Sequence, residues 1–268
     1  LYFISPIQKM YRKTAFLITA RLKSSRLPKK IILDVVGKPL LIHMLDRIKQ
    51  ASHIDKIIIC TSTNSQDDMI AEIAVKEGVS CYRGSEDDVL VRLYEAAQEY
   101  KVEYFVNITA DCPTVDPFFI DTLVSEYQKT KADLIMYRKL PAGQRPYLIK
   151  VKALKKVCEI KNETETEVWG DYFIKSGLFH IYDIEVDGKY RHPELRTSLD
   201  YPEDYEFIKK VFEELYKLQE VFSLLDIIEL VRKKPELLSI NSHCSMLSIE
   251  HIAHTAASVK YRIDNSFS

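Results

Sequence analysis

The sequence predicts an α/β fold: a doubly wound, mixed but mainly parallel sheet with helices on both faces. Short apolar runs alternate four times with helical patterns in the first half of the chain, which is typical of parallel sheets. The run KIIICT at 56–61 is apolar on both faces, as in a central parallel strand. With 268 residues, the chain is long enough for one large domain or for one domain with a small appendage.

Each element of the first half has a local signal. The first strand is the apolar run TAFLIT at 14–19, and the helix at 39–51 carries its apolar residues at helical spacing. The helix at 66–77 has acidic residues in its first turn and Gly78 just beyond its end, which are start and end signals. The other strands and helices of this half are expected at 56–61, 79–82, 87–100, 104–109 and 117–129.

The alternation weakens beyond residues 133–137. Pro202, at a first helical position and followed by two acidic residues, is a good helix start. The remaining expected elements are a strand at 147–151, a short helix at 153–160, an aromatic segment at 165–175, a strand ending at Asp200, and helices from Pro202 and at 224–232.

No repeat or flexible linker divides the chain, so we expect a single domain. Residues 1–9 resemble the remnant of a tag and are left out of the fold prediction. The expected parts are 14–130, 131–200 and 201–245 within a domain at 10–245, followed by a helical tail at 246–268.

Composition argues against several classes of protein. The net charge of −1 gives no reason to expect nucleic acid or an anionic membrane as a partner. No apolar stretch approaches the length that spans a bilayer. The five cysteines are scattered and form no C-x-x-C pair, which argues against a disulfide framework or a zinc ribbon. A reduced, cytoplasmic compartment fits this pattern best.

The stretch A-R-L-K-S-S-R-L-P-K-K at 20–30 lies between the first strand and the first helix. It places five cations in a loop at the carboxyl edge of the expected sheet, where α/β proteins bind ligands. Cations, hydroxyls and backbone N–H groups gathered there suit a polyphosphate. A solvated basic loop is the alternative interpretation.

Two carboxylates are candidate metal ligands. Asp111, in T-A-D-C-P, follows the fourth strand, and Asp200, in L-D-Y-P-E-D-Y, lies between a strand and a helix. Mg²⁺ commonly takes one or two carboxylates together with substrate phosphates, so the two could converge on one ion. A helix cap or a loop position is the alternative for each. Cys112 has no histidine placed by sequence to activate it, which favours packing over a nucleophilic role.

Six motifs occur in a fixed order along the chain. They are A-R-x-x-S-x-R-L-P-x-K at 20–30, G-K-P at 37–39, T-S-T-N at 61–64, R-G-S-E-D-D-V-L at 83–90, T-A-D-C-P at 109–113 and L-D-Y-P-E-D-Y at 199–205. This order resembles that of the cytidylyltransferases that make CMP-activated sugar acids, such as the CMP-sialate and CMP-ketodeoxyoctonate synthetases. It looks closest to the spore-coat polysaccharide branch of that family, and the resemblance spans residues 14–242.

The resemblance implies a Rossmann-like fold of the nucleotide-diphospho-sugar transferase type, with an acceptor and dimerisation part at 131–200. It also implies Mg²⁺-dependent transfer of CMP from CTP to an anionic acceptor, with release of pyrophosphate, by a homodimer. For the triphosphate it implies contacts with Ala20, Arg21, Ser24, Arg26 and Lys30, and for cytosine and ribose contacts with Ser62, Arg83, Gly84, Ser85 and Asp88. It assigns Mg²⁺ to Asp111 and Asp200, catalysis to these two with Arg21 and Lys30, and acceptor contacts to Arg145, Glu167, Trp169 and Tyr172. For Trp169, a place in the core is the alternative.

The sequence departs from the family pattern in two places. No glycine precedes Gly37, so side-chain cations would carry more of the phosphate recognition. The segment 138–151 lacks the P-x-G-L-x-V-E pattern expected of the spore-coat branch, and four basic residues lie in it: Arg138, Lys139, Arg145 and Lys150. Basic side chains suit an anionic acceptor, and a solvated edge hairpin is the alternative.

Several functions therefore stay open. The acceptor is expected to be a sugar acid or a related precursor of a surface polysaccharide, with a phosphonate or a phosphorylated small molecule as the alternative. A non-catalytic nucleotide-binding regulator of the same fold is a rival of another class. Within enzymes, the rivals are a nucleotidyltransferase for another base and a glycosyltransferase, although the last would be expected to carry a D-x-D motif, which T-A-D-C-P is not.

Overall fold

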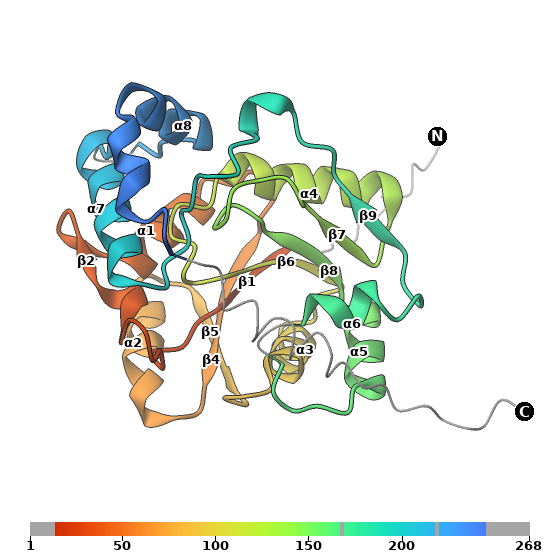
Figure 1. Ribbon diagram of the computed structural model, residues 1–268. Coiled ribbons are helices and arrows are strands. Elements are labelled where there is room, and N and C mark those ends of the chain that lie inside the picture. The colour runs from red at the N-terminus through yellow and green to blue at the C-terminus, as the bar shows by residue number, and fades with distance from the viewer. Residues whose placement is uncertain (1–13, 167–168, 218–219, 245–268) are drawn as a thin grey trace, which may run out of the picture.

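The computed structural model describes residues 14–166, 169–217 and 220–244, and Figure 1 shows one sheet with helices on both faces. The expected leader at 1–9 and the expected helical tail at 246–268 lie outside these residues. From edge to edge, the seven strands are β5 (Ser80–Gly84), β4 (Lys56–Ser62), β1 (Ala15–Thr19), β6 (Tyr104–Thr109), β8 (Tyr147–Lys150), β7 (Leu134–Met136) and β9 (Ile181–Asp183).

The direction of the strands confirms the α/β class with a mixed, mainly parallel sheet. β5, β4, β1 and β6 are parallel, and β7 pairs in parallel with β9. In the described sheet, β8 alone runs against its neighbours β6 and β7. Thr19 at the end of β1 pairs with Cys60 and Thr109, so three central strands end at the same edge.

Helices cover the sheet in the alternating order that the sequence predicts for the first half. They are α1 (Leu40–Ile48), α2 (Asp68–Lys76), α3 (Val89–Glu99), α4 (Pro117–Thr130), α5 (Val151–Ile160), α6 (Gly170–Ile174), α7 (Pro202–Leu215) and α8 (Leu224–Lys233). Four 3-10 turns and a small hairpin complete the described elements: η1 (Lys30–Ile32), η2 (Ser65–Asp67), η3 (Gly188–Tyr190), η4 (Pro235–Ile240), β2 (Asp34–Val35) and β3 (Lys38–Pro39).

Alternation along β1 divides the apolar core between the two faces, because successive strand residues point to opposite sides of a sheet. Phe16 and Ile18 belong to the cluster formed with α1, α2, α4, α7 and α8. Ala15 and Leu17 belong to the cluster formed with α3, α5 and α6. Figure 1 shows α3, α5 and α6 together on one side of the sheet and α1 and α4 on the other.

The expected strand ending at Asp200 is wrong. Between 196 and 200, the described chain makes a single β-bridge, from Arg196 to Ala142. Its backbone bonds go to two different loops: Thr197 N–H donates to the Ala142 carbonyl at 2.9 Å, and Leu199 N–H donates to the Asp111 carbonyl at 2.8 Å. The segment therefore ties loops together and does not extend the sheet.

The 131–200 part contains one close backbone approach that requires glycine. Gly143 has a φ of +88°, and a Cβ there would lie 2.5 Å from the backbone of Thr197 and Ser198. Any side chain at this position would push the 196–200 segment away from the loop. No helix within the described ranges is long and apolar enough to cross a bilayer.

Candidate functional site

The site lies where β1, β4, β5 and β6 end. β6 stops at Thr109, and a turn closed by Cys112 N–H donating to the Thr109 carbonyl at 3.1 Å places Asp111 beyond the strand. The Thr109 hydroxyl donates to Asp111 Oδ1. On the opposite side, Lys29 adopts a left-handed conformation with φ 57°, and η1 then begins at Lys30. The buried side chain of Ile31 anchors this turn to the core.

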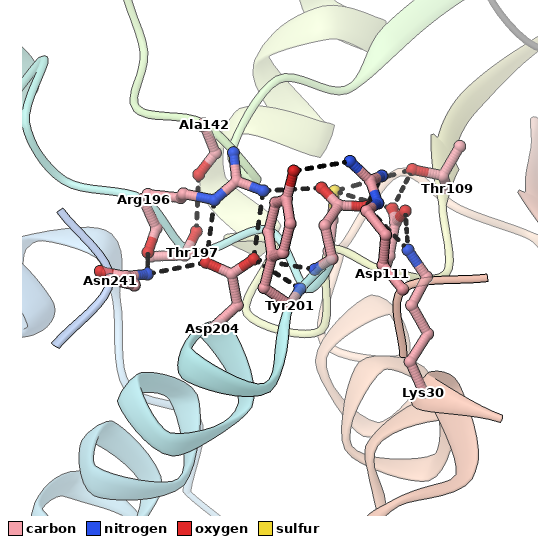
Figure 2. A network of polar contacts seen from close by, with 12 residues as sticks. Lys30, Thr109, Asp111, Ala142, Arg196, Thr197, Tyr201, Asp204 and Asn241 are labelled. Carbon is pink, nitrogen blue, oxygen red and sulfur yellow. Dashed lines mark hydrogen bonds and ion pairs between the residues drawn. The ribbon is translucent and has the colours of Figure 1, made fainter. Parts of the chain in front are cut away.

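Lys30 joins the two predicted metal ligands. Its Nζ lies 2.8 Å from Asp111 Oδ2 and 3.0 Å from Asp200 Oδ1, and the contact with Asp111 is visible in Figure 2. Both carboxylates therefore converge on one small cationic group although they are far apart in the sequence. The side chains of the three residues are 13%, 24% and 16% exposed, so the cluster is shielded but open to solvent.

This geometry keeps Lys30 and Asp111 charged. Burial lowers the pKa of the Lys30 ammonium, but Asp111 and Asp200 outweigh burial and raise it above its ordinary 10.5. Burial raises the pKa of the Asp111 carboxyl, but Lys30 outweighs it and holds this pKa below its ordinary 3.8. Lys30 and Asp111 therefore form an ionised pair at neutral pH.

Asp200 also contacts two arginines. Arg26 Nη2 lies 3.0 Å from Asp200 Oδ1, and the Arg26 guanidinium lies over the Tyr201 ring, 4.8 Å from its centroid. Arg196 Nη2 lies 2.7 Å from Asp200 Oδ2 and also reaches Asp204. The sequence analysis missed Arg196 and Asp204 as parts of the site. The signal available was their spacing of four residues on either side of Asp200.

The rest of the basic loop is exposed or contacts Glu86. Arg21 Nη1 donates to the Glu86 carbonyl at 2.8 Å, and Lys23 lies 3.3 Å from the Glu86 carboxylate. The Ser24 hydroxyl accepts from Leu27 N–H at 3.3 Å. A surface hollow of about 490 Å³ lies against this loop, lined by Leu22, Lys23, Ser24, Ser25, Pro28, Lys29 and Gln66. Ala20 is buried and donates its N–H to the Cys60 carbonyl at 3.1 Å.

Ser62 and Asp88, which the resemblance places near cytosine and ribose, are used by the protein itself. The buried Ser62 hydroxyl donates to Asp67, which also accepts Leu22 N–H at 2.8 Å. Asp88 caps α3 by accepting Val91 N–H at 3.1 Å, and it forms a buried ion pair with Lys161. Both side chains therefore support the loops of the site, and a direct contact with the nucleotide stays a prediction.

Arg83, Gly84 and Ser85 form the end of β5 and the start of the next loop. Arg83 pairs with Asp68 at 2.7 Å and donates to the Ser62 carbonyl at 2.9 Å. A Cβ on Gly84 would lie 2.8 Å from the Tyr82 ring, so only glycine fits without a shift. The Ser85 hydroxyl accepts from Asp88 N–H at 3.0 Å.

Arg92 is a buried cation that the sequence analysis missed. It is 0% exposed, and its Nη1 donates to the carbonyls of Ser85 and Glu86, the latter at 3.1 Å. Burial, together with the nearby charge of Arg21, lowers the Arg92 pKa. The guanidinium therefore fixes the backbone that carries the R-G-S-E motif. Its position in α3, among apolar residues, gave no sign of this role.

The predicted acceptor residues separate into three groups. Trp169 and Tyr172 are 7% and 3% exposed and pack in the apolar cluster formed with α3, α5 and α6. The centroid of the Trp169 ring lies 5.3 Å from that of the Tyr147 ring. A direct contact of Trp169 or Tyr172 with an acceptor stays a prediction that this packing does not favour. Arg145 is half-buried, and its Nε donates to the Leu140 carbonyl at 2.5 Å. Glu167 lies outside the described residues.

The basic character of the 138–151 segment is largely neutralised. Arg138 pairs with Asp183 at 2.6 Å, Lys139 with Glu185 at 3.5 Å and Lys150 with Asp133 at 3.3 Å. Burial lowers the pKa of Arg145, which donates to a carbonyl. These lysines and arginines therefore offer less positive charge to an acceptor than the sequence predicts.

Gln144, which was not predicted from the sequence as part of the site, joins three loops. It is 0% exposed, and its Nε2 donates to the Thr114 carbonyl at 2.8 Å and to the Thr197 hydroxyl at 3.2 Å. Its Oε1 accepts Asp116 N–H at 3.2 Å. The chain after β6, the 140–146 loop and the 196–200 segment are thereby held in one arrangement.

Comparisons with known proteins agree with this architecture. A family model described as cytidylyltransferase matches residues 15–229. The spore coat polysaccharide biosynthesis protein SpsF of Bacillus subtilis (strain 168) is 26% identical over 228 residues, 82% of this chain and 95% of that protein. A 3-deoxy-manno-octulosonate cytidylyltransferase of Brucella ovis is 32% identical over 128 residues, 46% of this chain and 49% of that one. A solved structure of a cytidylyltransferase from Leptospira borgpetersenii serovar Hardjo-bovis (strain JB197) aligns with a TM-score of 0.78 at 28% identity, covering 85% of this chain and 97% of that chain.

Proposed function

Because this chain belongs to the cytidylyltransferase family and is therefore a nucleotidyltransferase, we propose that it transfers CMP from CTP to an anionic acceptor. An acceptor oxygen bonds to the α-phosphorus, and the bond from that phosphorus to the bridging oxygen breaks. Pyrophosphate leaves with the electron pair, and a hydroxyl acceptor loses its proton to solvent. The observation that carries this proposal is the position of Lys30 between Asp111 and Asp200 at the carboxyl edge of the sheet.

The donor set of this cluster fits Mg²⁺. An ammonium already touches both carboxylates, so their oxygens converge within reach of one small cation. Hard divalent cations take oxygen ligands, and Mg²⁺ commonly uses one or two carboxylates plus substrate phosphates. We propose Asp111 and Asp200 as the residues that hold it. When bound, Mg²⁺ would neutralise charge on the α-phosphate and orient the acceptor oxygen.

The basic loop supplies the charge that the triphosphate needs. Nucleotidyl transfer asks little covalent chemistry of the protein and depends on positioning and on neutralising phosphate charge. Lys30 and Arg26 lie at the carboxylate cluster, and Arg21 lies at the base side of the same loop. The hollow against residues 22–29 gives a polyphosphate room next to these cations. We propose that the three side chains stabilise the departing pyrophosphate.

We propose that the acceptor is a sugar acid or a related precursor of a surface polysaccharide. The names of two relatives support this class: one is a spore coat polysaccharide biosynthesis protein, and the other acts on 3-deoxy-manno-octulosonate. Because the 138–151 segment lacks the pattern expected of the spore-coat branch, a phosphonate or a phosphorylated small molecule is the alternative acceptor. We also propose a cytoplasmic homodimer, on the family resemblance and on the free cysteines of the described chain.

One panel experiment tests this proposal. The protein is incubated with Mg²⁺ and each of the four ribonucleoside triphosphates, crossed with acidic sugars, phosphonates and phosphorylated alcohols, and pyrophosphate release is measured. We expect release with CTP and a sugar acid only. Release with another nucleotide would overturn the assignment of CTP, and release with a phosphonate would select the alternative acceptor. Tight CTP binding without release for any acceptor would favour the non-catalytic regulator.

A further inference from the structure

Arg196 joins the metal-binding carboxylate to a fully buried one. Its Nη2 lies 2.7 Å from Asp200 Oδ2, and the same nitrogen and Nε lie 3.1 and 2.8 Å from the two oxygens of Asp204 (Figure 2). Arg196 is 6% exposed and Asp204 is 0% exposed. Its third nitrogen, Nη1, is buried without a hydrogen-bond partner in the described structure, so the guanidinium is committed to these two carboxylates.

Asp204 is a fixed anchor for this contact. Its Oδ2 accepts the N–H groups of Asp200 and Tyr201 at 2.9 and 3.0 Å, which fixes the first turn of α7. Its Oδ1 accepts from Asn241 Nδ2 at 2.9 Å. Because Asp204 is held from both sides, it cannot follow a movement of Arg196. The guanidinium is therefore held in one orientation by a group that does not itself reach Lys30.

The two oxygens of Asp200 have separate partners. Oδ2 accepts from Arg196, whereas Oδ1 faces Lys30 and Arg26. With Oδ2 held, rotation of the carboxylate about its last bond is blocked, and Oδ1 stays directed at Asp111 and Lys30. An arginine can hold two carboxylates through its planar fork, which a lysine cannot do.

We propose that Arg196 is a positioning residue for the metal site: it orients Asp200 so that one oxygen is presented beside Asp111. This inference rests on the proposed function, because it assumes that the carboxylates hold a divalent cation. Partners that orient a ligating carboxylate typically contribute about 10- to 100-fold to metal affinity or activity. In this role Arg196 acts through its contact with Asp200.

The test measures metal binding apart from turnover. Mn²⁺ binding to the full chain, with CTP present and no acceptor, is followed by the EPR signal of free Mn²⁺ for wild type, Arg196→Lys and Arg196→Gln. We expect the Mn²⁺ dissociation constant to rise about 10-fold in Arg196→Lys and about 100-fold in Arg196→Gln. The Mg²⁺ concentration for half-maximal pyrophosphate release should rise in the same order, with turnover partly restored at high Mg²⁺.

Asn241→Ala is the matched control. It removes the hydrogen bonds that Asn241 Nδ2 donates to Asp204 Oδ1 and to the Arg196 carbonyl, and it leaves the side-chain contact between Arg196 and Asp200 in place. It should therefore lower the melting temperature without changing Mn²⁺ binding. If Arg196→Gln binds Mn²⁺ as tightly as wild type does, the positioning role is overturned and the proposed function stands. If wild type binds no Mn²⁺ even with CTP, the metal assignment and this inference both fall.

Discussion

Two pairs of aspartates at the same edge of the sheet have opposite uses. Asp111 and Asp200 keep side chains 24% and 16% exposed and share the ammonium of Lys30. Asp67 is 0% exposed and the side chain of Asp88 is 10% exposed, and their oxygens are taken by backbone N–H groups, hydroxyls and Lys161. All four residues are aspartates at the same edge of the sheet. Their hydrogen-bond and ion-pair partners therefore decide which pair keeps oxygens that a ligand could reach.

The lysines of the two regions show the same division. Lys30 lies in an accessible cluster where a divalent cation and a phosphate could both compete for its contacts. Lys161 pairs with Asp88 behind the R-G-S-E loop, with side chains only 6% and 10% exposed. We therefore propose that Lys30 takes part in the reaction and that Lys161 holds a loop. Four substitutions test this contrast, and they are ordered by their expected effect on turnover.

The largest effect is expected from Asp111→Ala. Losing one charge-stabilising contact at a reacting centre typically costs about 10²–10³ in rate, and this variant loses a ligand oxygen as well, so we expect a loss at or beyond the upper end. Pyrophosphate release should fall accordingly while circular dichroism stays unchanged. Full turnover in a folded Asp111→Ala protein would contradict the metal assignment.

Lys30→Met should be next, with a loss of about 10²-fold in turnover. The variant removes a competitor for the two carboxylates, so Mn²⁺ alone should bind more tightly than to wild type although catalysis is impaired. Opposite signs for binding and turnover distinguish this role from general damage. Weaker binding of Mn²⁺ alone would show that Lys30 supports the metal site and does not compete with it.

The same variant should also change how the stability of the protein depends on pH. The lowered pKa of Asp111 contributes stability above its ordinary 3.8, which is lost as the pH falls through the folded-state value. The raised pKa of Lys30 contributes stability below its ordinary 10.5, which is lost as the pH rises through the folded-state value. The difference in unfolding free energy between wild type and Lys30→Met should therefore be largest at pH values between the folded-state pKa of Asp111 and that of Lys30. It should shrink at more acidic and more alkaline pH, which urea unfolding across pH would measure.

Lys161→Met is the matched substitution in the other region. It leaves the carboxylate of Asp88 buried without its cation, and breaking a buried pair in this way costs about 3–5 kcal/mol. Urea unfolding should show this loss, whereas turnover of the folded variant should change far less than in Lys30→Met. If Lys161→Met lowers turnover as strongly and keeps its stability, the contrast between the two lysines is wrong.

The part of the site that could be predicted is the part set by topology. Parallel strands bring their carboxyl ends to one edge, so a basic loop after β1 and an aspartate after β6 must lie near each other. That argument placed Lys30 and Asp111 correctly beside one another. The α/β class could also be predicted, because strand and helix patterns alternate clearly in the first half of the chain.

The rest depends on tertiary packing that leaves no local pattern. The sequence does not show that β8 inserts antiparallel between β6 and β7, or that Gln144 bridges three loops. Nor does it separate Asp88, an N-cap with a buried lysine, from a ligand-facing aspartate in the same motif. The same holds for Trp169. Its position in a motif favoured a contact with the acceptor, whereas the structure packs it in the apolar cluster with β1, α3 and α5.

The smallest effect is expected from Cys112→Ala, although Cys112 lies beside the cluster, with its Sγ 3.6 Å from Asp111 Oδ1. Burial raises the pKa of this thiol, and the charge of Asp111 raises it further, so the thiolate is scarce at neutral pH. Turnover should stay close to wild type, and the unfolding free energy should change by about 1 kcal/mol. Iodoacetamide should modify Cys112 in the folded protein far more slowly than in urea. A large loss of turnover in Cys112→Ala, with Asp111 unchanged, would mean that proximity to the ionised cluster gives this thiol a role that its packing does not indicate.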